Sequence, residues 1–425
     1  MKLCGSRALF WFVIVYAALL LFLAPCLTLW LDEILTLTGA VQPNLASMME
    51  NLRKQQGASP LAFLIPHWTI ALLGLSNFTA RITSVIPAVA SCPAIFLLAR
   101  RAGLAYPILA VAIFALWPLE FRYALEARPY ALALCLGLWL TVAFLAGANA
   151  ILYISITLAM ALTHPYALVF PLAHLVYAFA RQRSLARTPA IAIALSVLVL
   201  LPWYAHFRDD WRTVSAEQEL SPTNWRAPLV FLREISGSGY FGAAILITGI
   251  ALGLRRIQLR PLWIALALVP LIAIPLANIA FDYFFAVRQV IYALPALALL
   301  FTAGTDHPRA TRCLAIAFLI ASVYADVRWF TRPREDWSAA ANAAVTEVNK
   351  GACIAYVADA EKLYMFFRPE LAAHHCEPGA PRVILAGSTY ETATHQSAAR
   401  AILTSRGLTR QSQQSFEGPT LEIYQ

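Results

Sequence analysis

Twelve apolar runs, separated by short loops, occupy residues 1–330 and constrain this chain more than any other feature. A simple helical span of a bilayer needs about 20 predominantly apolar residues, and several of the runs approach or exceed that length. Only 13% of the residues are charged, against about 25% in a typical soluble domain, and 60% are hydrophobic. The sequence therefore predicts an α-helical polytopic membrane protein. It excludes a disordered chain, a coiled coil, a collagen and a disulfide scaffold.

The basic residues indicate which ends of the spans face the cytoplasm. The first run, Ala8–Trp30, is too long for a signal peptide and lacks a cleavage motif, so we interpret it as a span with a cytoplasmic N-terminus. The net charge of +9 reflects membrane orientation, and we expect no nucleic-acid partner. Cytoplasmic loops carry an excess of Lys and Arg, and the basic clusters in these loops are Arg100-Arg101, Arg181–Arg187, Arg255–Arg260 and Arg309–Arg312.

Charge parity reduces the twelve runs to about eleven predicted spans. If all twelve crossed, the basic clusters would not all lie on one side. The run Leu61–Leu75 is short, contains Pro66 and follows Pro60, so we expect it to lie along or dip into the outer membrane interface. The first outer loop is then 31–77, and a long outer loop follows at 207–236. The acids of that long loop are interpreted as a solvated face: Asp209, Asp210, Glu217 and Glu219.

The last segment, 331–425, reads as a separate soluble domain beside the membrane module 1–330. It holds 10 of the 23 acidic residues and alternates helix-like with strand-like patterns. We predict a small extracytoplasmic α/β domain, periplasmic or extracellular, in a multi-pass protein of the cell (inner) membrane. The expected helices are Trp337–Asn349, Glu361–Ala373 and Gln396–Ser405, and the expected strands are Cys353–Val357, Val383–Leu385 and Leu421–Tyr424.

Two of the seven cysteines, Cys353 and Cys376, lie in this predicted domain. They can form a disulfide if the domain is extracytoplasmic, because disulfides persist in oxidising compartments. No C-x-x-C pair occurs, which argues against a structural zinc site. The sequence leaves the pairing open.

Charged side chains collect at the predicted outer ends of the spans, where burying them is costly unless they have a partner or a task. Carboxylates there can accept a proton or bind a metal, and Arg forks pair with phosphate oxygens. Each residue also has a structural alternative, such as a boundary marker, a loop-closing ion pair or an interfacial anchor. The residues are Asp32 and Glu33 at the expected end of the first helix, then Arg81, Glu120, Arg122, Glu126, Arg128, His164 and Arg288.

Six short motifs follow one another over about residues 1–340: Asp32-Glu33, Ser59–Trp68 followed by Arg81, Glu126–Tyr130, Thr163–Tyr166, Arg288–Pro295 and Asp336-Trp337. In this order they resemble the GT-C superfamily of polyprenyl-phosphate-sugar-dependent glycosyltransferases. The resemblance is to the bacterial relatives of protein O-mannosyltransferases and to the lipid A aminoarabinose transferase, and Glu126-Ala127-Arg128-Pro129-Tyr130 is its most specific piece. Two departures are Ala58-Ser59-Pro60, where His-Pro-Pro is usual, and Leu125, where Gln is common.

The resemblance implies an integral membrane glycosyltransferase. Its donor would be a polyprenyl-phosphate sugar in the lipid bilayer, and its acceptor an envelope glycan, lipid or protein, with inversion at the anomeric carbon. Asp32 would be the catalytic base, supported by Glu33. A divalent cation, Mg or Mn, would have Asp32 and Glu126 as candidate ligands. The substrate-binding residues would be Arg81, Glu126, Arg128, Tyr130, His164 and Arg288.

A transporter, flippase or ligase of lipid-linked sugars is the alternative function. A transporter would place charges near the bilayer midplane and repeat them between two halves of the chain. The charges here cluster at one predicted face, and the sequence shows no internal repeat. The sequence therefore favours the transferase.

Overall fold

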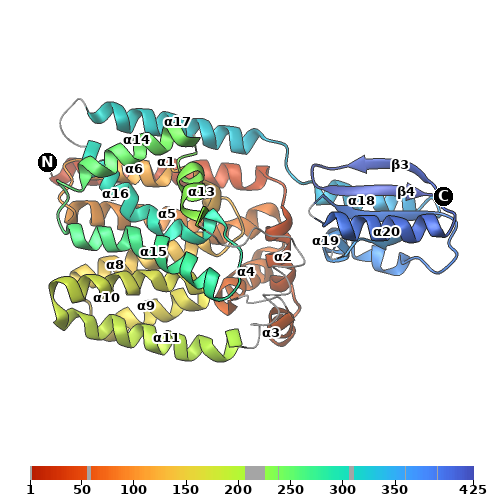
Figure 1. Cartoon of the computed structure of the whole chain (residues 1–425), viewed down its shortest axis with the longest axis horizontal. Coiled ribbons are helices and arrows are strands. Elements are labelled where there is room, and N and C mark those ends of the chain that lie inside the picture. The colour runs from red at the N-terminus through yellow and green to blue at the C-terminus, as the bar shows by residue number, and fades with distance from the viewer. Residues whose placement is uncertain are drawn as a thin grey trace.

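A helical bundle and a small α/β domain lie side by side along the long axis of the molecule, with the N-terminus at the end of the bundle farthest from that domain (Figure 1). The computed structural model describes residues 2–54, 59–205, 225–237, 239–305, 311–358, 360–389 and 391–425. Within these ranges the bundle is formed by α1 (Lys2–Leu23), α5 (Asn77–Arg101), α6 (Pro107–Ala115), α7 (Pro118–Ala124), α8 (Tyr130–Ala146), α9 (Ala150–Thr163), α10 (Val169–Arg181), α11 (Arg187–Ala205), α13 (Ala227–Ile235), α14 (Gly239–Gly253), α15 (Arg260–Ala280), η4 (Val287–Ala293), α16 (Leu294–Thr305) and α17 (Arg312–Thr331).

The helices of the bundle are those of a multi-pass membrane protein. Among the described residues, 6 helices are long and apolar enough to cross a bilayer, or up to 8 if each bent pair is one span. The pair α6 and α7 bends by 66° where Pro118 begins the second helix, because proline has no N–H to continue the first. Other predicted spans correspond to shorter helices such as α8 and α9. The count of eleven crossings stays a prediction.

The first helix ends earlier than the sequence suggested. It stops at Leu23, and Ala24–Cys26 form a single 3₁₀ turn that contains Pro25. The chain then runs extended to Trp30, and a new helix, α2 (Leu31–Ala40), begins. The prediction that Asp32 and Glu33 end the first helix is therefore wrong. Both residues lie in the first turn of α2. A helix N-terminus favours carboxylates, since its free N–H groups and its dipole are positive.

The segment 31–77, the predicted first outer loop, contains three helices. After α2 come α3 (Leu45–Lys54) and α4 (Pro60–Leu73), and the three lie at the end of the bundle that faces the α/β domain (Figure 1). Helix α4 covers most of the run Leu61–Leu75, and its 14 residues rise only about 21 Å, short of the roughly 30 Å hydrocarbon core. Close packing joins α2 to α4: a Cβ at Gly39 would lie 2.8 Å from the Phe63 ring. The interfacial position of α4 stays a prediction.

The loops that carry several of the basic clusters meet at the end of the bundle away from the α/β domain. The backbone N–H of Gln258 donates to the Ala102 carbonyl (3.0 Å), and Arg256 Nη1 donates to the Gly304 carbonyl (3.1 Å). Arg312 Nη2 also donates to the Tyr106 hydroxyl (3.0 Å). One end of the bundle is thus basic. Its cytoplasmic orientation stays a prediction.

The α/β domain is a four-stranded sheet with strand order β1-β2-β4-β3. Strand β1 (Cys353–Tyr356) is parallel to β2 (Val383–Ser388), and β4 (Pro419–Tyr424) is antiparallel to both β2 and β3 (Arg410–Ser415). Its helical elements are α18 (Trp337–Val348), α19 (Ala360–Phe367), η6 (Pro369–His374) and α20 (Ala393–Ser405).

Two details of this domain differ from the prediction. Strand β3 was missed because all six of its residues are exposed and its sequence is polar throughout, so no alternating apolar pattern marks it. The predicted helix Glu361–Ala373 ends at Phe367, because Pro369 disfavours helical geometry at the residue before it.

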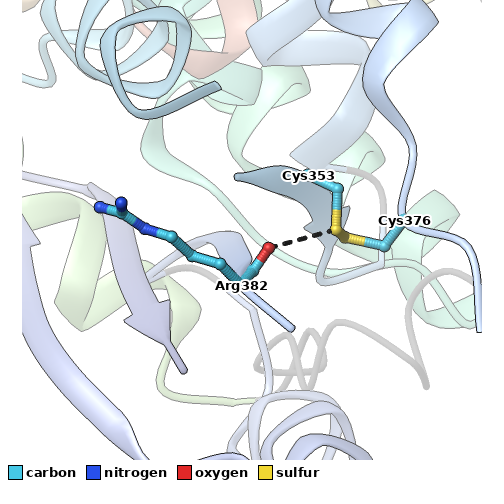
Figure 2. Close-up of a disulfide and its surroundings, with 3 residues drawn as sticks. All are labelled: Cys353, Cys376 and Arg382. Carbon is cyan, nitrogen blue, oxygen red and sulfur yellow. Dashed lines mark hydrogen bonds between the residues drawn. A yellow bond between two sulfur atoms is a disulfide. The ribbon is translucent and has the colours of Figure 1, made fainter. Parts of the chain in front are cut away.

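A disulfide joins Cys353 to Cys376 (Figure 2), so the pairing that the sequence left open is present in the structure. It fastens the segment after η6 to the start of β1. The backbone N–H of Cys353 donates to the Arg382 carbonyl (3.1 Å), whose oxygen also lies 3.5 Å from the Cys353 Sγ. The N–H of Cys376 donates to the Ile354 carbonyl (3.1 Å).

Candidate functional site

Three segments far apart in the sequence bring their charged side chains together at the end of the bundle next to the α/β domain. Asp32 lies in the first turn of α2, Arg128 in the loop between α7 and α8, and Arg288 in η4. The Asp32 Oδ2 atom is 3.6 Å from Arg128 Nη2 and 3.3 Å from Arg288 Nη2. Arg128 Nη1 also donates to the Asp32 carbonyl (3.1 Å) and to Thr36 Oγ1 (2.9 Å). All three charged side chains are about one-fifth to one-quarter exposed, so a ligand can reach them.

Glu33 and Arg81 form a second ion pair, which is completely buried. Arg81 Nε and Nη2 donate to the two Glu33 carboxylate oxygens (2.8 and 2.7 Å), and both side chains are 0% exposed. The remaining donations of Arg81 go to the carbonyls of Ala24, Leu27 and Thr28. The pair therefore ties α5 to the connection between α1 and α2.

Glu33 also holds the loop that carries Arg128. Its Oε1 atom accepts a hydrogen bond from the backbone N–H of Ala127 (2.7 Å), the residue before Arg128. Its Oε2 accepts one from the N–H of Trp30 at the start of α2 (3.3 Å). One carboxylate thus connects the segments that position Asp32 and Arg128.

Glu126 lies deeper in the same region. Its carboxylate is 3% exposed, its Oε1 is 3.9 Å from Arg122 Nε, and burial followed by the nearby Glu33 raises its pKa to about 8. Arg334, from the linker that follows α17, interacts electrostatically with Glu126 and Glu33 and stacks 4.2 Å from the Trp329 ring. Burial lowers the pKa of Arg334. Near neutral pH, Glu126 is therefore substantially protonated and can donate a hydrogen bond.

Aromatic rings form the wall beside the two arginines. The His164 ring centroid is 5.0 Å from Tyr130, 5.5 Å from Tyr166 and 5.8 Å from Tyr292, and the Arg128 guanidinium lies 5.9 Å from the Tyr130 centroid. Burial, with the charges of Arg128 and Arg288, lowers the pKa of His164 to about 3. Its imidazole is therefore neutral.

Several polar atoms of this region are buried without a hydrogen-bond partner among the described residues. An unsatisfied buried donor or acceptor costs about 1–3 kcal/mol, so such groups are rare in folded proteins. These atoms are therefore available to form hydrogen bonds with a polar ligand. The atoms are Trp30 Nε1, Glu126 Oε2, Arg128 Nε, His164 Nδ1, the Tyr292 hydroxyl and Arg334 Nη1.

The donors at this site do not fit a resident divalent cation. Among the residues that the structure describes, no three His, Cys, Asp or Glu side chains gather into a metal-binding group. Asp32 and Glu126 were the candidate ligands, but the Asp32 carboxylate faces two guanidinium groups that already neutralise it. Those groups can themselves supply positive charge to an anionic ligand.

Sequence reasoning missed four side chains around this centre. Thr36 contacts Arg128 and stands four residues after Asp32, a spacing that would have revealed it had α2 been recognised as a helix. Tyr292 lies one turn beyond Arg288, and Arg334 and Glu335 adjoin the Asp336-Trp337 motif. The sequence carries no signal that the linker returns to α2. The predicted loop acids Asp209, Asp210, Glu217 and Glu219 lie outside the described residues.

Comparison with known proteins identifies the fold. No family model matches the chain, and no curated protein does. Two solved structures are similar over nearly the whole length: ArnT from Cupriavidus metallidurans in the apo state (TM-score 0.59, 11% identity, 98% of each chain) and the same protein bound to undecaprenyl phosphate (TM-score 0.58, 12% identity, 97% of each chain). The chain therefore has the fold of these ArnT structures over nearly its whole length, the C-terminal domain included, which agrees with the fold expected from the motifs.

Proposed function

We propose, from this fold and the sequence motifs, that the chain is an integral membrane glycosyltransferase of the GT-C type that uses a polyprenyl-phosphate sugar as donor. The observation that carries the proposal is the Asp32 carboxylate held between the guanidinium groups of Arg128 and Arg288 at the end of the bundle next to the α/β domain. That arrangement places a proton acceptor beside two phosphate-binding groups. The similar ArnT structure bound to undecaprenyl phosphate supports a lipid phosphate as the ligand.

The donor phosphate would bind the two arginines. Guanidinium forks match phosphate oxygens in a bidentate way, which makes Arg the preferred residue for this task. The arginines now pair with Asp32, so an incoming phosphate competes for them and releases the carboxylate. Arg128 keeps its position through its bonds to the Asp32 carbonyl and Thr36. Donor binding would therefore create a free base next to the sugar.

Transfer would proceed by a single displacement. The acceptor hydroxyl oxygen attacks the anomeric carbon, the bond from that carbon to the phosphate oxygen breaks, and its electron pair leaves with the polyprenyl phosphate. The hydroxyl proton moves to the Asp32 carboxylate, and the anomeric configuration is inverted. Arg128 and Arg288 stabilise the charge that develops on the phosphate, the kind of electrostatic effect that is usually the largest catalytic term.

The other predicted site residues take supporting roles in this proposal. Glu33 and Arg81 position Asp32 and the Arg128 loop, since their polar atoms bond to one another and to the backbone. Protonated Glu126 can donate to a donor oxygen. Tyr130 and the neutral His164 form an aromatic wall of the kind on which a sugar ring can lie.

The extracytoplasmic placement of the site rests on two supports. The basic loops meet at the opposite end of the bundle, as expected for a cytoplasmic side. The disulfide Cys353–Cys376 suits an oxidising compartment such as the periplasm. The acceptor is then an envelope glycan, lipid or protein. A transporter would instead place its charged site near the middle of the membrane.

Purified protein in detergent tests the donor. We expect sugar transfer to envelope membranes from a deletion strain when a labelled polyprenyl-phosphate sugar is supplied, and none from the matching nucleotide sugar. Asp32→Asn should reduce transfer by about 10²-fold or more, since positioned proton transfer contributes on that order. Glu370→Gln, at an exposed carboxylate of the C-terminal domain, is the control and should transfer normally. Robust transfer from the nucleotide sugar alone contradicts the proposal.

Arg128 provides a second test of the same site. Arg128→Ala should lower kcat/KM for the lipid donor by about 10- to 100-fold, because a hydrogen bond to a charged group contributes about 1.5–3 kcal/mol. Arg128→Lys should fall between the wild type and the alanine variant, since it keeps the charge and loses the fork. Equal activity of the three proteins removes Arg128 from the donor site.

A further inference from the structure

We propose that Glu335, in the linker between α17 and α18, is a positioning residue that holds the start of α2 and thereby Asp32. The C-terminal domain is then part of the catalytic unit and not only a cover over the acceptor route. This inference rests on the proposed function, in which Asp32 is the base. Glu335 is 304 positions away in the sequence from its hydrogen-bond partner, Leu31 at the start of α2, so only the fold brings the two residues together.

The geometry is a cap supplied by a distant segment. The Glu335 Oε2 atom accepts a hydrogen bond from the backbone N–H of Leu31 (2.8 Å), the first residue of α2 and the neighbour of Asp32. The same oxygen accepts one from the Trp337 Nε1–H (2.7 Å). Glu335 is only 6% exposed, and Trp337 is completely buried as the first residue of α18. Glu335 thus joins the beginning of α2 to the beginning of α18.

Helix α2 needs this cap. Its N-cap residue is Trp30, whose side chain has no acceptor for the free N–H groups of the first turn. Glu33 accepts from the Trp30 N–H, and Glu335 accepts from the next one, that of Leu31. A carboxylate at this end also interacts favourably with the helix dipole. Without Glu335, the Leu31 N–H at the start of this turn loses its acceptor.

Apolar packing makes the connection continuous. Leu29 beside α2, and Ile34 and Leu37 within it, share one buried cluster with Trp337 and Tyr364 of the C-terminal domain. The domain is therefore packed against the element that carries the proposed base (Figure 1). Because Arg128 and Arg288 both contact the Asp32 carboxylate, a shift of α2 changes the alignment of base and phosphate-binding groups together. Misplacement by about 1 Å can reduce a rate by 10²-fold.

The hydrogen bonds from the Leu31 N–H and the Trp337 Nε1–H both reach a single oxygen of Glu335, so a side chain that keeps one such oxygen can replace it. Glu335→Gln retains a carbonyl oxygen that can accept both bonds, whereas Glu335→Ala retains none. We expect Glu335→Ala to lower kcat by about 10- to 100-fold with less than a threefold change in the KM for the donor. Glu335→Gln should stay within threefold of the wild type in both parameters.

Asp336→Ala is the matched control. Asp336 Oδ1 accepts from the Ala339 N–H and caps α18, so this variant removes a helix cap one residue away without touching α2. Its kcat should stay within threefold of the wild type. A loss equal to that of Glu335→Ala would mean that general loosening of the C-terminal domain explains the effect, and would overturn the positioning role.

Hydrogen–deuterium exchange of the full-length proteins in detergent gives a readout that does not depend on transfer. Exchange of peptides within 28–40 should be faster in Glu335→Ala and unchanged in Glu335→Gln and Asp336→Ala. Unchanged exchange and unchanged kcat in Glu335→Ala overturn the inference, as does faster exchange spread over the whole C-terminal domain. Activity lost equally in Glu335→Gln would assign the effect to charge and also overturn it. A wrong assignment of Asp32 as the base would give a different result: Asp32→Asn would transfer sugar normally, while Glu335→Ala would still show faster exchange within 28–40.

Discussion

Replacement of Arg81 separates a structural role from the substrate contact that the sequence suggested. Arg81→Met leaves the Glu33 carboxylate, which is 0% exposed, without its counter-charge. It also leaves the carbonyls of Ala24, Leu27 and Thr28 without the guanidinium. Removing one partner of a buried ion pair costs about 3–5 kcal/mol. Because proteins are stable by only about 5–15 kcal/mol, the variant should unfold at a clearly lower temperature.

A double variant tests whether the loss comes from the unpaired charge. Arg81→Met combined with Glu33→Gln removes both charges and keeps an acceptor for the Ala127 N–H, so it should be more stable than Arg81→Met alone. The carbonyl partners remain lost, so recovery should be partial. Arg382→Met breaks the more exposed pair with Glu347 and should cost about 1 kcal/mol or less.

Thermal unfolding in detergent and donor kinetics on the same preparations measure both effects. The structural role of Arg81 is refuted if the free energy of unfolding of Arg81→Met lies within about 1 kcal/mol of the wild-type value and its KM for the donor rises tenfold or more. That result would return Arg81 to the substrate site.

Three further predictions concern pH, the disulfide and topology. The pKa of Glu126 is raised from 4.5 to about 8 in the folded protein, so the folded state binds more protons than the unfolded state between these pH values. The free energy of unfolding should therefore fall as pH rises from 4.5 to 8, by at most about 1.4 kcal/mol per pH unit. Glu126→Gln should flatten this pH dependence when unfolding is measured over the same range. The double variant Cys353→Ser and Cys376→Ser opens a loop with a sequence separation of 23 and should destabilise the C-terminal domain by about 3 kcal/mol. Cys313→Ser, at an exposed cysteine outside this disulfide, should not. Alkaline phosphatase fusions at Thr331 and Asn77 should be active and one at Gly103 inactive; an inactive fusion at Asn77 would mean that the run Leu61–Leu75 crosses the membrane.

The features that depend on local composition could be predicted from the sequence. Apolar runs identify membrane helices because lipid contact demands nearly continuous hydrophobicity, and the motifs around Asp32, Arg128 and Arg288 indicated the residues that the fold brings together. The C-terminal strands β1, β2 and β4 were found because apolar residues dominate the segments Cys353–Val357, Val383–Leu385 and Leu421–Tyr424. Strand β3 was not, because its side chains are exposed and polar and carry no alternating pattern.

The contacts that each of these residues makes depend on the tertiary packing, which local sequence does not reveal. Asp32 and Glu33 are neighbours of the same chemical type, yet one carboxylate is accessible beside two arginines and the other is sealed against Arg81. The difference arises because successive positions in the first turn of α2 point in different directions, Glu33 toward Arg81 and Asp32 toward Arg128 and Arg288. Local sequence specifies that a carboxylate is present, but the packing of distant helices and of the linker at Glu335 specifies its partner, and the partner decides whether it can react.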